Sequence, residues 1–280
     1  MRINFDINME IQPGTFRQAV HEIGKKYYWG FENKSYLPRD LLRSKTDMNR
    51  IFKLLGVPTP HLIFGKTHFS EIVFPEENEF VLKPDFGVGS QGVFVLERRD
   101  EMFFDHFNKS RFTEHELKER IEGIAAARKK YRHWVAEERL TDSSKEGLVV
   151  DYKFYCFFGK SPLLLVKLNK PNRYAWLNCA GNMVDTGEYN DRHASDFAPP
   201  PNIGELWQMA ENISKKIPLP FCRVDLYNTS GGVVAGELTP TPGRPEYLFN
   251  DEWEGILLDN LRDGLGRLSH WENNEVFELA

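Results

Sequence analysis

The chain has 280 residues, of which 41% are hydrophobic and 28% charged, so it can bury a sizeable core without a metal or disulfides. Its net charge of −5 argues against a protein that binds nucleic acid regardless of sequence, because such proteins carry a basic surface. Three widely spaced cysteines, Cys156, Cys179 and Cys222, predict reduced thiols in a cytosolic protein.

The opening segment, "MRINFDINMEIQPG", lacks the basic start and the apolar run of a signal peptide. No stretch approaches 18 uninterrupted apolar residues, which a membrane-spanning helix needs. We therefore expect a soluble cytoplasmic protein without a transmembrane segment. Attachment to the surface of a membrane assembly stays open, and the sequence does not indicate an oligomeric state.

Two helices are predicted before residue 57. The first covers 15–28 behind an N-cap at Thr15, because four apolar residues share one helical face: Phe16, Val20, Ile23 and Tyr27. The second covers "KTDMNRIFKLLG" and ends at Gly56. The two prolines of "VPTPHLIF" then stop the helix, so an extended segment is expected there.

Residues 79–97, "EFVLKPDFGVGSQGVFVLE", predict a strand, a glycine-rich loop and a second strand. The loop, Gly87 to Gly92, matches G-x-G-x-x-G, but a dinucleotide-binding fold needs a helix after it, whereas "VFVLERR" is typical of a strand. A protein kinase carries its lysine on a later strand, whereas Lys83 precedes this loop. Glycines between strands allow backbone N–H groups to approach phosphate oxygens. An ordinary hairpin with a glycine-rich turn is the alternative.

The rest of the chain alternates strands and helices. "TEHELKERIEGIAAARKKY" predicts a helix that opens with a capping box from Thr113 to Glu116. Strands are predicted at "HWVAEERL", "VVDYKFYCFFG" and "PLLLVKLN", and helices at "GELWQMAENISKKI" and "DEWEGILLDNLRDGL". This order predicts an α+β or α/β protein of more than one lobe.

A hairpin is predicted at 223–243, "RVDLYNTSGGVVAGELTPTPG". Side chains alternate along a strand, so Arg223 and Asp225 share a face. An odd-numbered loop such as 229–231 pairs Arg223 with Glu237 and leaves Asp225 diagonal to it on the same side. Two carboxylates on neighbouring strands suit magnesium, which takes hard oxygen ligands together with substrate phosphates. A cross-strand salt bridge between Arg223 and Glu237 is the alternative.

Five segments, in this order, resemble the ATP-grasp superfamily and, within it, the TupA-like group named for teichuronopeptide biosynthesis. They are "SKTDMNRIFKLLGVPTP", "FVLKPDFGVGSQGV", "WVAEERL", "DYKFYCFFGK" and "FCRVDLYNTSGGVVAGELTPTPG". The resemblance implies an α+β ATP-grasp fold in which a nucleotide is held between two α+β lobes. We expect an N-terminal region at 1–75, a small lobe with the glycine-rich loop at 76–138 and a large lobe with the metal site at 139–280.

The resemblance implies ATP and Mg2+ as cofactors. Lys45 and Lys83 match positions that contact nucleotide phosphates, and "AEERL" matches the hinge beside the adenine. Either Glu137 or Glu138 is expected to bond the exocyclic amine. The complete nucleotide-binding set is Lys45, Lys83, Gly87, Gly89, Ser90, Gln91, Gly92, Glu137, Glu138, Arg139 and Leu140. The alternative for Lys45 is a solvated lysine near the start of a helix, and the alternative for Glu137 or Glu138 is an exposed strand residue.

The catalytic and metal positions are also implied by the resemblance. Lys153 matches a basic residue facing the phosphates or the acyl substrate, although it has the alternative of pairing with an acid across the sheet. Arg223 matches a residue that steadies the transferring phosphoryl group, and Asp225 and Glu237 match magnesium ligands. Thr239 stands where many members carry an asparagine that supports a second metal, so one or two ions remain open.

The resemblance implies an ATP-dependent carboxylate–amine ligase that forms an amide through an acyl phosphate. Its carboxylate and amine substrates are expected to be small molecules, glycans or peptides, possible examples being a uronic acid or an amino acid of a surface polysaccharide. A small-molecule or sugar kinase on the same fold and a non-catalytic nucleotide-binding module are the alternatives. Arg173, Arg192 and His193 are candidate anion contacts on the acceptor side, where surface loops explain them equally well.

Overall fold

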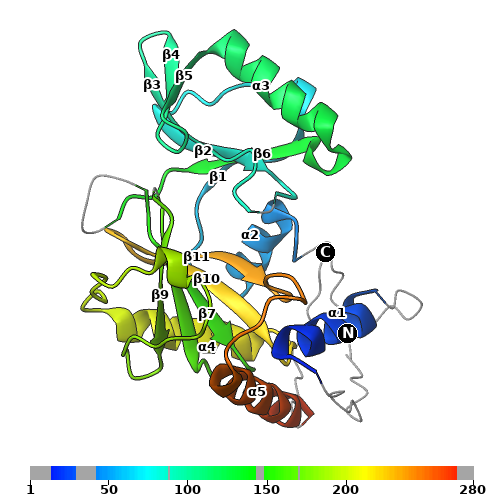
Figure 1. Cartoon of the computed structure of the whole chain (residues 1–280). Helices are drawn as coiled ribbons and strands as arrows, with labels where there is room; N and C mark the ends of the chain where they lie inside the picture. The colour runs from blue at the N-terminus through cyan, green and yellow to red at the C-terminus, as the bar shows by residue number, and fades with distance from the viewer. Residues whose placement is uncertain (1–13, 30–41, 88, 143–147, 170, 270–280) are drawn as a thin grey trace. The chain divides into compact units, whose positions relative to one another are not determined.

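The computed structural model describes residues 14–29, 42–87, 89–142, 148–169 and 171–269 (Figure 1). The chain separates into two compact units. Unit 1 comprises Met1–Leu42, Asp151–Leu226 and Glu237–Ala280, and unit 2 comprises Arg43–Val150 and Tyr227–Gly236. The three-part division expected from sequence stays a prediction, as does the placement of a nucleotide between two lobes.

Unit 2 contains a six-stranded antiparallel sheet of order β1-β6-β2-β3-β4-β5. Its strands are β1 (Leu62–His68), β2 (Glu79–Pro84), β3 (Phe94–Arg99), β4 (Met102–Asp105), β5 (Ser110–Thr113) and β6 (His133–Glu138). Helix α3 (Glu114–Ala127) covers one face, where Leu117 and Ile121 pack against Phe80, Leu82 and Trp134 (Figure 1). Helix α2 (Lys45–Leu54) begins this unit. The second face of the sheet is therefore left to side chains that alternate with the core residues.

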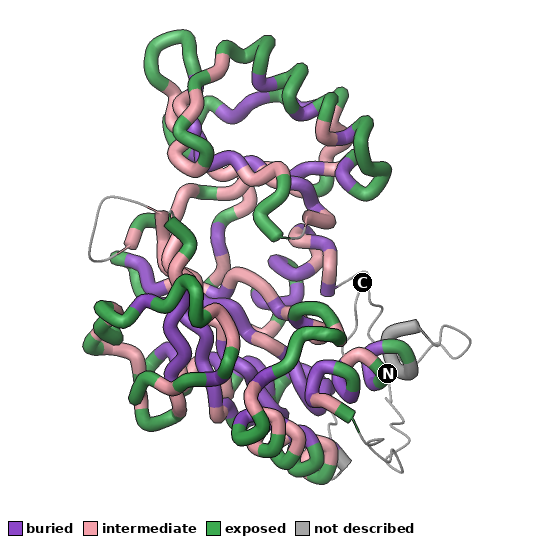
Figure 2. The backbone as a smooth tube through the Cα atoms, viewed as in Figure 1, coloured by how far each residue is buried: buried purple, intermediate pink, exposed green. Residues whose placement is uncertain are grey.

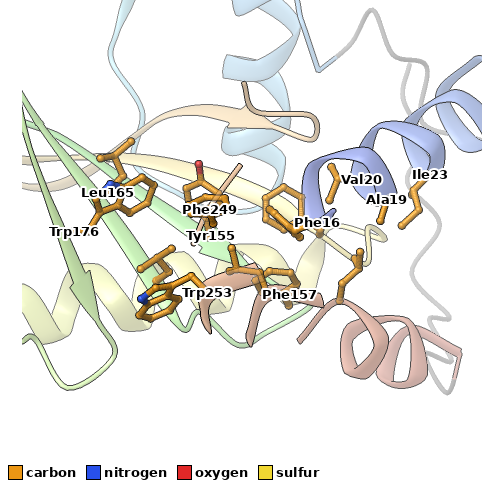
Figure 3. Packing of buried hydrophobic residues seen from close by; sticks show 14 of the residues in the cluster. Phe16, Ala19, Val20, Ile23, Tyr155, Phe157, Leu165, Trp176, Phe249 and Trp253 are labelled. Carbon is orange, nitrogen blue, oxygen red and sulfur yellow. The ribbon is translucent and has the colours of Figure 1, made fainter. Parts of the chain in front are cut away.

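The second sheet has five strands in the order β11-β10-β7-β8-β9 and belongs to unit 1, except that the hairpin tip Tyr227–Gly236 is assigned to unit 2. Its strands are β7 (Asp151–Cys156), β8 (Leu163–Leu168), β9 (Arg173–Asn178), β10 (Cys222–Thr229) and β11 (Gly232–Thr239), and the helices of unit 1 are α1 (Phe16–Trp29), α4 (Ile203–Lys216) and α5 (Asp251–Ser269). Phe16 on α1 is fully buried among Tyr155, Phe157, Phe249 and other aromatic residues of this unit (Figure 3). Figure 2 shows buried stretches along the strands of this sheet.

Three short 3-10 turns complete the described elements. They are Phe69–Glu71, Lys129–Tyr131 and Asn190–Arg192. No helix in the described parts of the chain combines the length and the apolar character that crossing a bilayer requires.

The helix boundaries confirm the predicted caps. The Gln18 backbone N–H donates to Thr15 Oγ1 at 3.3 Å, so Thr15 caps α1. The Glu116 N–H donates to Thr113 Oγ1 at 3.3 Å while the Thr113 N–H donates to the Glu116 carboxylate at 2.7 Å, which is the predicted capping box. Gly56 has φ +68° directly after α2, as expected of a C-terminal glycine.

The predicted three-residue hairpin loop is wrong. β10 ends at Thr229 and β11 begins at Gly232, so only Ser230 and Gly231 separate them. Thr229 Oγ1 donates to Gly232 O at 2.7 Å and accepts from the Gly231 N–H at 3.2 Å, so Thr229 belongs to β10 and the loop begins one residue later than predicted. The sequence also gave no prediction of β4, β5 or β9. Val88, the Tyr27 side chain and the segment 1–13 lie outside what the structure describes.

We expect Thr113→Ala to lower the free energy of unfolding by about 1 kcal/mol, because it removes the N-cap acceptor of α3. Chemical denaturation at neutral pH measures this loss. Glu122→Ala, at an exposed position of the same helix, is the control and should change stability little. Equal losses in the two variants would contradict a capping role.

The same capping box predicts a pH dependence. Hydrogen bonds from the Thr113 backbone and hydroxyl lower the pKa of Glu116 below its ordinary value. A depressed carboxyl pKa stabilises the fold fully above the unfolded-state pKa, and this stabilisation is lost as the pH falls through the folded-state pKa. The stability difference between wild type and Thr113→Ala should therefore shrink on acidification, which denaturation at a series of pH values measures.

Candidate functional site

In unit 2, Lys83 and Glu137 form an ion pair on the sheet face opposite the hydrophobic core. Lys83 on β2 lies opposite Val135, and Val81 lies opposite Glu137, so the two charged residues are diagonal neighbours on adjacent strands. Each side chain is only 13% exposed. A cation and an acceptor are thus held together on a largely covered surface.

Lys45 and the glycine-rich loop are joined directly. Lys45 is the first residue of α2, and its Nζ donates to Gly87 O at 3.1 Å. Gly89 and Gly92 have φ values of +63° and +74°, and a Cβ on Gly92 would lie 3.0 Å from the Pro84 ring. Glycine is therefore required at position 92 for both conformation and space.

Two polar residues of the loop are also placed. Ser90 shares the left-handed conformation of its glycine neighbours, with φ +61°. Gln91 Oε1 accepts a hydrogen bond of 2.9 Å from the Tyr131 hydroxyl, which ties the loop to the short turn before β6. Left-handed residues in such a loop turn backbone N–H groups toward a common side, an arrangement that suits anions.

The predicted hinge, residues 136–140, begins within β6 and ends two residues after it. Glu138 is exposed, and its Oε1 accepts from the His61 backbone N–H at 2.8 Å. Arg139 donates to Glu79 at 2.6 Å, and Leu140 is half-buried. Both glutamates thus already have partners, Lys83 for Glu137 and His61 for Glu138, so the choice between them for an adenine amine stays a prediction.

In unit 1, Arg223, Asp225 and Lys153 form a compact charged cluster on one sheet face. Asp225 is 1% exposed. Arg223 holds it with two hydrogen bonds, from Nε at 2.6 Å and from a terminal nitrogen at 2.7 Å. Lys153, directly opposite Asp225 in the β10–β7 register, donates at 2.7 Å and lies 3.4 Å from Asp151. Lys153 therefore has the cross-sheet acid partner that the sequence offered as its alternative.

The electrostatics of this cluster keep all three groups ionised. Burial acts to raise the pKa of Asp225, but Arg223 and Lys153 outweigh burial and lower it. Burial acts to lower the pKa of Arg223, but the Asp225 charge outweighs burial and raises it. Burial likewise acts to lower the pKa of Lys153, but the charges of Asp151 and Asp225 raise it. The buried carboxylate is thus a permanent anion with two fixed counter-ions.

Glu237 and Thr239 on β11 are the other two residues predicted to bind the metal. Arg223 donates to Thr239 Oγ1 at 3.1 Å, and the Glu237 charge acts on Arg223. The burial pattern of β11 breaks its alternation at Gly236 and Glu237. Among the residues that the structure describes, none donates to or pairs with the Glu237 carboxylate. The predicted alternative, an Arg223–Glu237 salt bridge, is thus replaced by the pairing of Arg223 with Asp225.

These donors fit a magnesium ion chemically. Asp225 and Glu237 provide hard carboxylate oxygens and Thr239 a neutral hydroxyl, the ligand types that Mg2+ accepts. Both Asp225 oxygens already accept hydrogen bonds from Arg223 and Lys153, so Asp225 can bind a cation only through its remaining lone pairs or in exchange for one of these bonds. The Glu237 carboxylate has no such partner among the described residues.

Lys167 is a charged residue of this face that the sequence analysis did not single out. It lies on β8 directly opposite Asp151. Burial, followed by the charges of Lys153 and Arg223, lowers the pKa of Lys167. No hydrogen bond or ion pair joins its ammonium group to another described residue. The signal was present in "PLLLVKLN", where a lysine interrupts an apolar strand in phase with the buried Leu163 and Leu165.

The acceptor-side candidates are engaged with their own neighbours. Arg173 pairs with Asp196 at 2.5 Å. The guanidinium of Arg192 lies 5.1 Å from the ring centre of Tyr174, and His193 forms an isolated β-bridge with Tyr174. These contacts give the three residues structural roles, and their assignment as anion contacts stays a prediction.

A further group of potential metal ligands lies in unit 2, at Glu79, Glu97 and His106, whose donor atoms are within 4.8 Å of one another. Arg139 pairs with Glu79 at 2.6 Å and Arg99 with Glu97 at 2.8 Å. Hydrogen bonds from Arg99 and His106 lower the pKa of Glu97 to about 2. Protein cations thus already balance these carboxylates, and the group is an ion-pair network.

Solved structures similar to this chain include three ligases. D-alanine–D-alanine ligase from Bacillus anthracis is 17% identical, with 82% of this chain and 69% of that chain covered and a TM-score of 0.48. L-amino acid ligase from Bacillus licheniformis is 12% identical, with 82% and 53% covered and a TM-score of 0.46. The ATP-grasp ligase PsnB, in complex with a phosphomimetic variant of its minimal precursor, Mg and ADP, is 14% identical, with 91% and 70% covered and a TM-score of 0.45.

At these identities and TM-scores the likeness assigns no activity. Among curated proteins none matches the sequence. A family model described as TupA-like ATPgrasp matches residues 28–262, a range that contains every residue predicted for the site. The expected α+β ATP-grasp fold is thereby confirmed, and its strands form the two sheets described above. The chain belongs to the TupA-like ATP-grasp family.

Proposed function

We propose that the protein is an ATP- and Mg2+-dependent carboxylate–amine ligase. The observation that carries this proposal is the Asp225 cluster, in which a buried carboxylate is held by Arg223 and Lys153 on the sheet face that also carries Thr239. Such a cluster provides hard oxygens for a cation and fixed positive charge for a phosphoryl group. Lys45, Lys83 and the loop 87–92 are the proposed contacts to the nucleotide phosphates.

The proposed reaction has two steps. A substrate carboxylate oxygen attacks the γ-phosphorus of ATP, the bond to the β-γ bridging oxygen breaks, and ADP leaves with that electron pair. An amine then attacks the acyl carbon, inorganic phosphate leaves, and the nitrogen loses a proton. Bound Mg2+ supplies positive charge that offsets the phosphate oxygens. Arg223 and Lys153 orient Asp225 and add positive charge at the transferring group.

The two buried cysteines fit a route without a covalent enzyme intermediate. Cys156 and Cys222 lie opposite each other on β7 and β10, and both are buried. Burial raises the pKa of both thiols, so neither is a thiolate at neutral pH. Direct transfer between bound substrates needs positioning and charge neutralisation, which the described face provides.

The proposed substrates rest on the resemblance to the TupA-like group, which is named for teichuronopeptide biosynthesis. We propose a carboxylate from a uronic acid, an amino acid or a peptide of a surface polysaccharide, and an amine as acceptor. The protein would act in the cytoplasm on small molecules, glycans or peptides. To test this, the protein is incubated with ATP, Mg2+ and pooled carboxylates and amines. The release of ADP and the masses of new products are then measured. An amide mass together with ADP and phosphate is expected.

Other products would identify other reactions. A stable phosphate ester as product would show that the protein is a kinase on the same fold and not a ligase. AMP with pyrophosphate would contradict the acyl-phosphate route. If the protein binds ATP and the double variant Asp225→Ala, Glu237→Ala keeps full function, the protein is a non-catalytic nucleotide-binding module.

We expect Glu237→Gln to lower kcat at saturating ATP by about 100-fold, because it removes a metal carboxylate. Since the Glu237 carboxylate has no hydrogen-bond or ion-pair partner among the described residues, the melting temperature should change little. Asp225→Asn should lower both activity and melting temperature, because it weakens the counter-ion of Arg223 and Lys153. Asp259→Asn, on the exposed part of α5, is the control. Unchanged kcat in Glu237→Gln would remove Glu237 from the metal site.

We propose that Lys167 binds the substrate carboxylate, because its ammonium group lies on the face of the Asp225 cluster and has no hydrogen-bond or ion-pair partner among the described residues. Lys167→Met should then raise the KM for the carboxylate substrate by about tenfold or more while the KM for ATP stays unchanged. A lowered lysine pKa means that the fold disfavours the charged form, so the variant should also melt at a higher temperature than wild type below the lysine's ordinary pKa. Lys160→Met, at an exposed position in the same unit, is the control. A lower melting temperature with unchanged kinetics would show that Lys167 only serves folding.

A further inference from the structure

Asp85 is a fully buried carboxylate placed between the two predicted phosphate-binding segments. It follows β2 directly, two residues after Lys83, and is 0% exposed. Its Oδ1 accepts from the backbone N–H and from the hydroxyl of Thr46, both at 2.9 Å. Its own backbone N–H donates to His133 O at 2.8 Å, which anchors it to β6.

These bonds use the backbone donors at the start of α2. The Lys45 N–H donates to Asp85 O at 3.0 Å and the Thr46 N–H to Asp85 Oδ1. The Asp47 N–H donates to Ser44 Oγ at 3.2 Å, and the Met48 N–H to Ser44 O at 2.9 Å. A helix N-terminus ordinarily offers such donors to a phosphate. Here the protein itself occupies them, so Lys45 must reach a nucleotide through its side chain.

The same contacts determine where that side chain starts. Lys45 Nζ donates to Gly87 O at 3.1 Å, and Gly87 is two residues beyond Asp85. The Gly87 N–H in turn donates to Pro84 O at 3.1 Å, which fixes the first turn of the loop. Asp85 therefore ties the base of Lys45 and the start of the glycine-rich loop to one strand end.

Asp85 also carries a cost that packing alone does not explain. Its Oδ2 is buried and has no hydrogen-bond partner among the described residues. An unpaired buried carboxylate oxygen is unfavourable, and the partial positive charge of the helix N-terminus offsets only part of this. A buried polar atom without a partner calls for an explanation other than stability. Here that atom lies where the start of α2 meets the end of β2, so we look for a role of Asp85 in the position of α2.

We propose that Asp85 is a positioning residue for ATP, which docks the start of α2 onto the end of β2 so that Lys45 is directed to the glycine-rich loop. This inference rests on the proposed function and deepens it. Asp85 acts through Lys45 and does not itself contact the nucleotide.

Calorimetric affinities for ATP with Mg2+ test the proposal, at a temperature where circular dichroism shows each variant folded. Lys45→Met should weaken binding by about tenfold or more, the loss expected for one charge-assisted contact. Asp85→Ala should weaken it by a similar factor. The double variant should bind no more weakly than Lys45→Met, because residues that act through one another are non-additive. Asp85→Asn, which keeps an oxygen for Thr46, should recover most of the affinity.

Asp105 provides a matched control in the same unit. It is also 0% exposed, and it accepts from the backbone N–H groups of Val95 at 3.1 Å and Phe107 at 2.8 Å. Asp105→Ala should lower the melting temperature without changing the ATP affinity. If Asp85→Ala fails to fold, Thr46→Val removes only the hydroxyl bond and should weaken ATP binding by a smaller factor.

The outcomes separate the two proposals. If Lys45→Met weakens binding but the Asp85 and Thr46 variants change only the melting temperature, as Asp105→Ala does, the positioning role is wrong and the nucleotide site stands. Additive losses in the double variant would equally overturn it. If wild type binds no ATP, or Lys45→Met binds as tightly as wild type, the proposed nucleotide role of Lys45 fails and the inference fails with it.

Discussion

The burial of Asp225 is the constraint on which the charged face of unit 1 depends. A carboxylate that is only 1% exposed is tolerated only with matched positive charge. The β10–β7 register places Lys153 directly opposite Asp225, and Arg223 on the same strand as Asp225 donates two hydrogen bonds to it. Removing one partner of such a buried pair commonly costs about 3–5 kcal/mol. The sheet register, the ionisation of all three groups and the position of the proposed metal oxygens are therefore one linked property.

Each unit uses a buried aspartate in its own way. Asp225 pairs with side-chain cations, so its charge is neutralised locally. Asp85 instead accepts from a hydroxyl and a helix N-terminal N–H, so its charge is met mainly by backbone dipoles. The first arrangement fixes the positions of two cations around one carboxylate, whereas the second fixes the geometry of a helix and a loop.

The elements with strong local signals were predictable from sequence. Caps at Thr15 and Thr113, the glycine-rich loop and the shared face of Arg223 and Asp225 all follow from short patterns, and the structure bears them out. The hairpin register was not predictable, because it depended on whether Thr229 joins the strand, which its side-chain bonds decide. β9 was not predicted because its sequence, "RYAWLN", directly follows "NKPN", which is typical of a loop.

Long-range partners were also hidden in the sequence. Asp85 follows a strand in "VLKPDFG", and nothing local shows that its acceptor oxygen faces Thr46, 39 positions earlier. Lys153 presented the opposite difficulty, because its pattern fitted both a substrate contact and a cross-sheet ion pair. Only the register with β10 showed that the ion pair forms.

The Lys83–Glu137 ion pair bears on ligand selectivity. In the ligand-free state the cation that would meet a phosphate already has an anion beside it, on a surface where each side chain is 13% exposed. A lone inorganic phosphate that drew Lys83 away would strand the Glu137 carboxylate in a poorly solvated place, a loss it does not repay. A ligand that brings an amino group to Glu137 as well as an anion to Lys83 leaves neither residue unpaired. A ligand that displaces Lys83 therefore has to bring its own hydrogen-bond donor to Glu137, or one of the two charges is left largely buried without a partner.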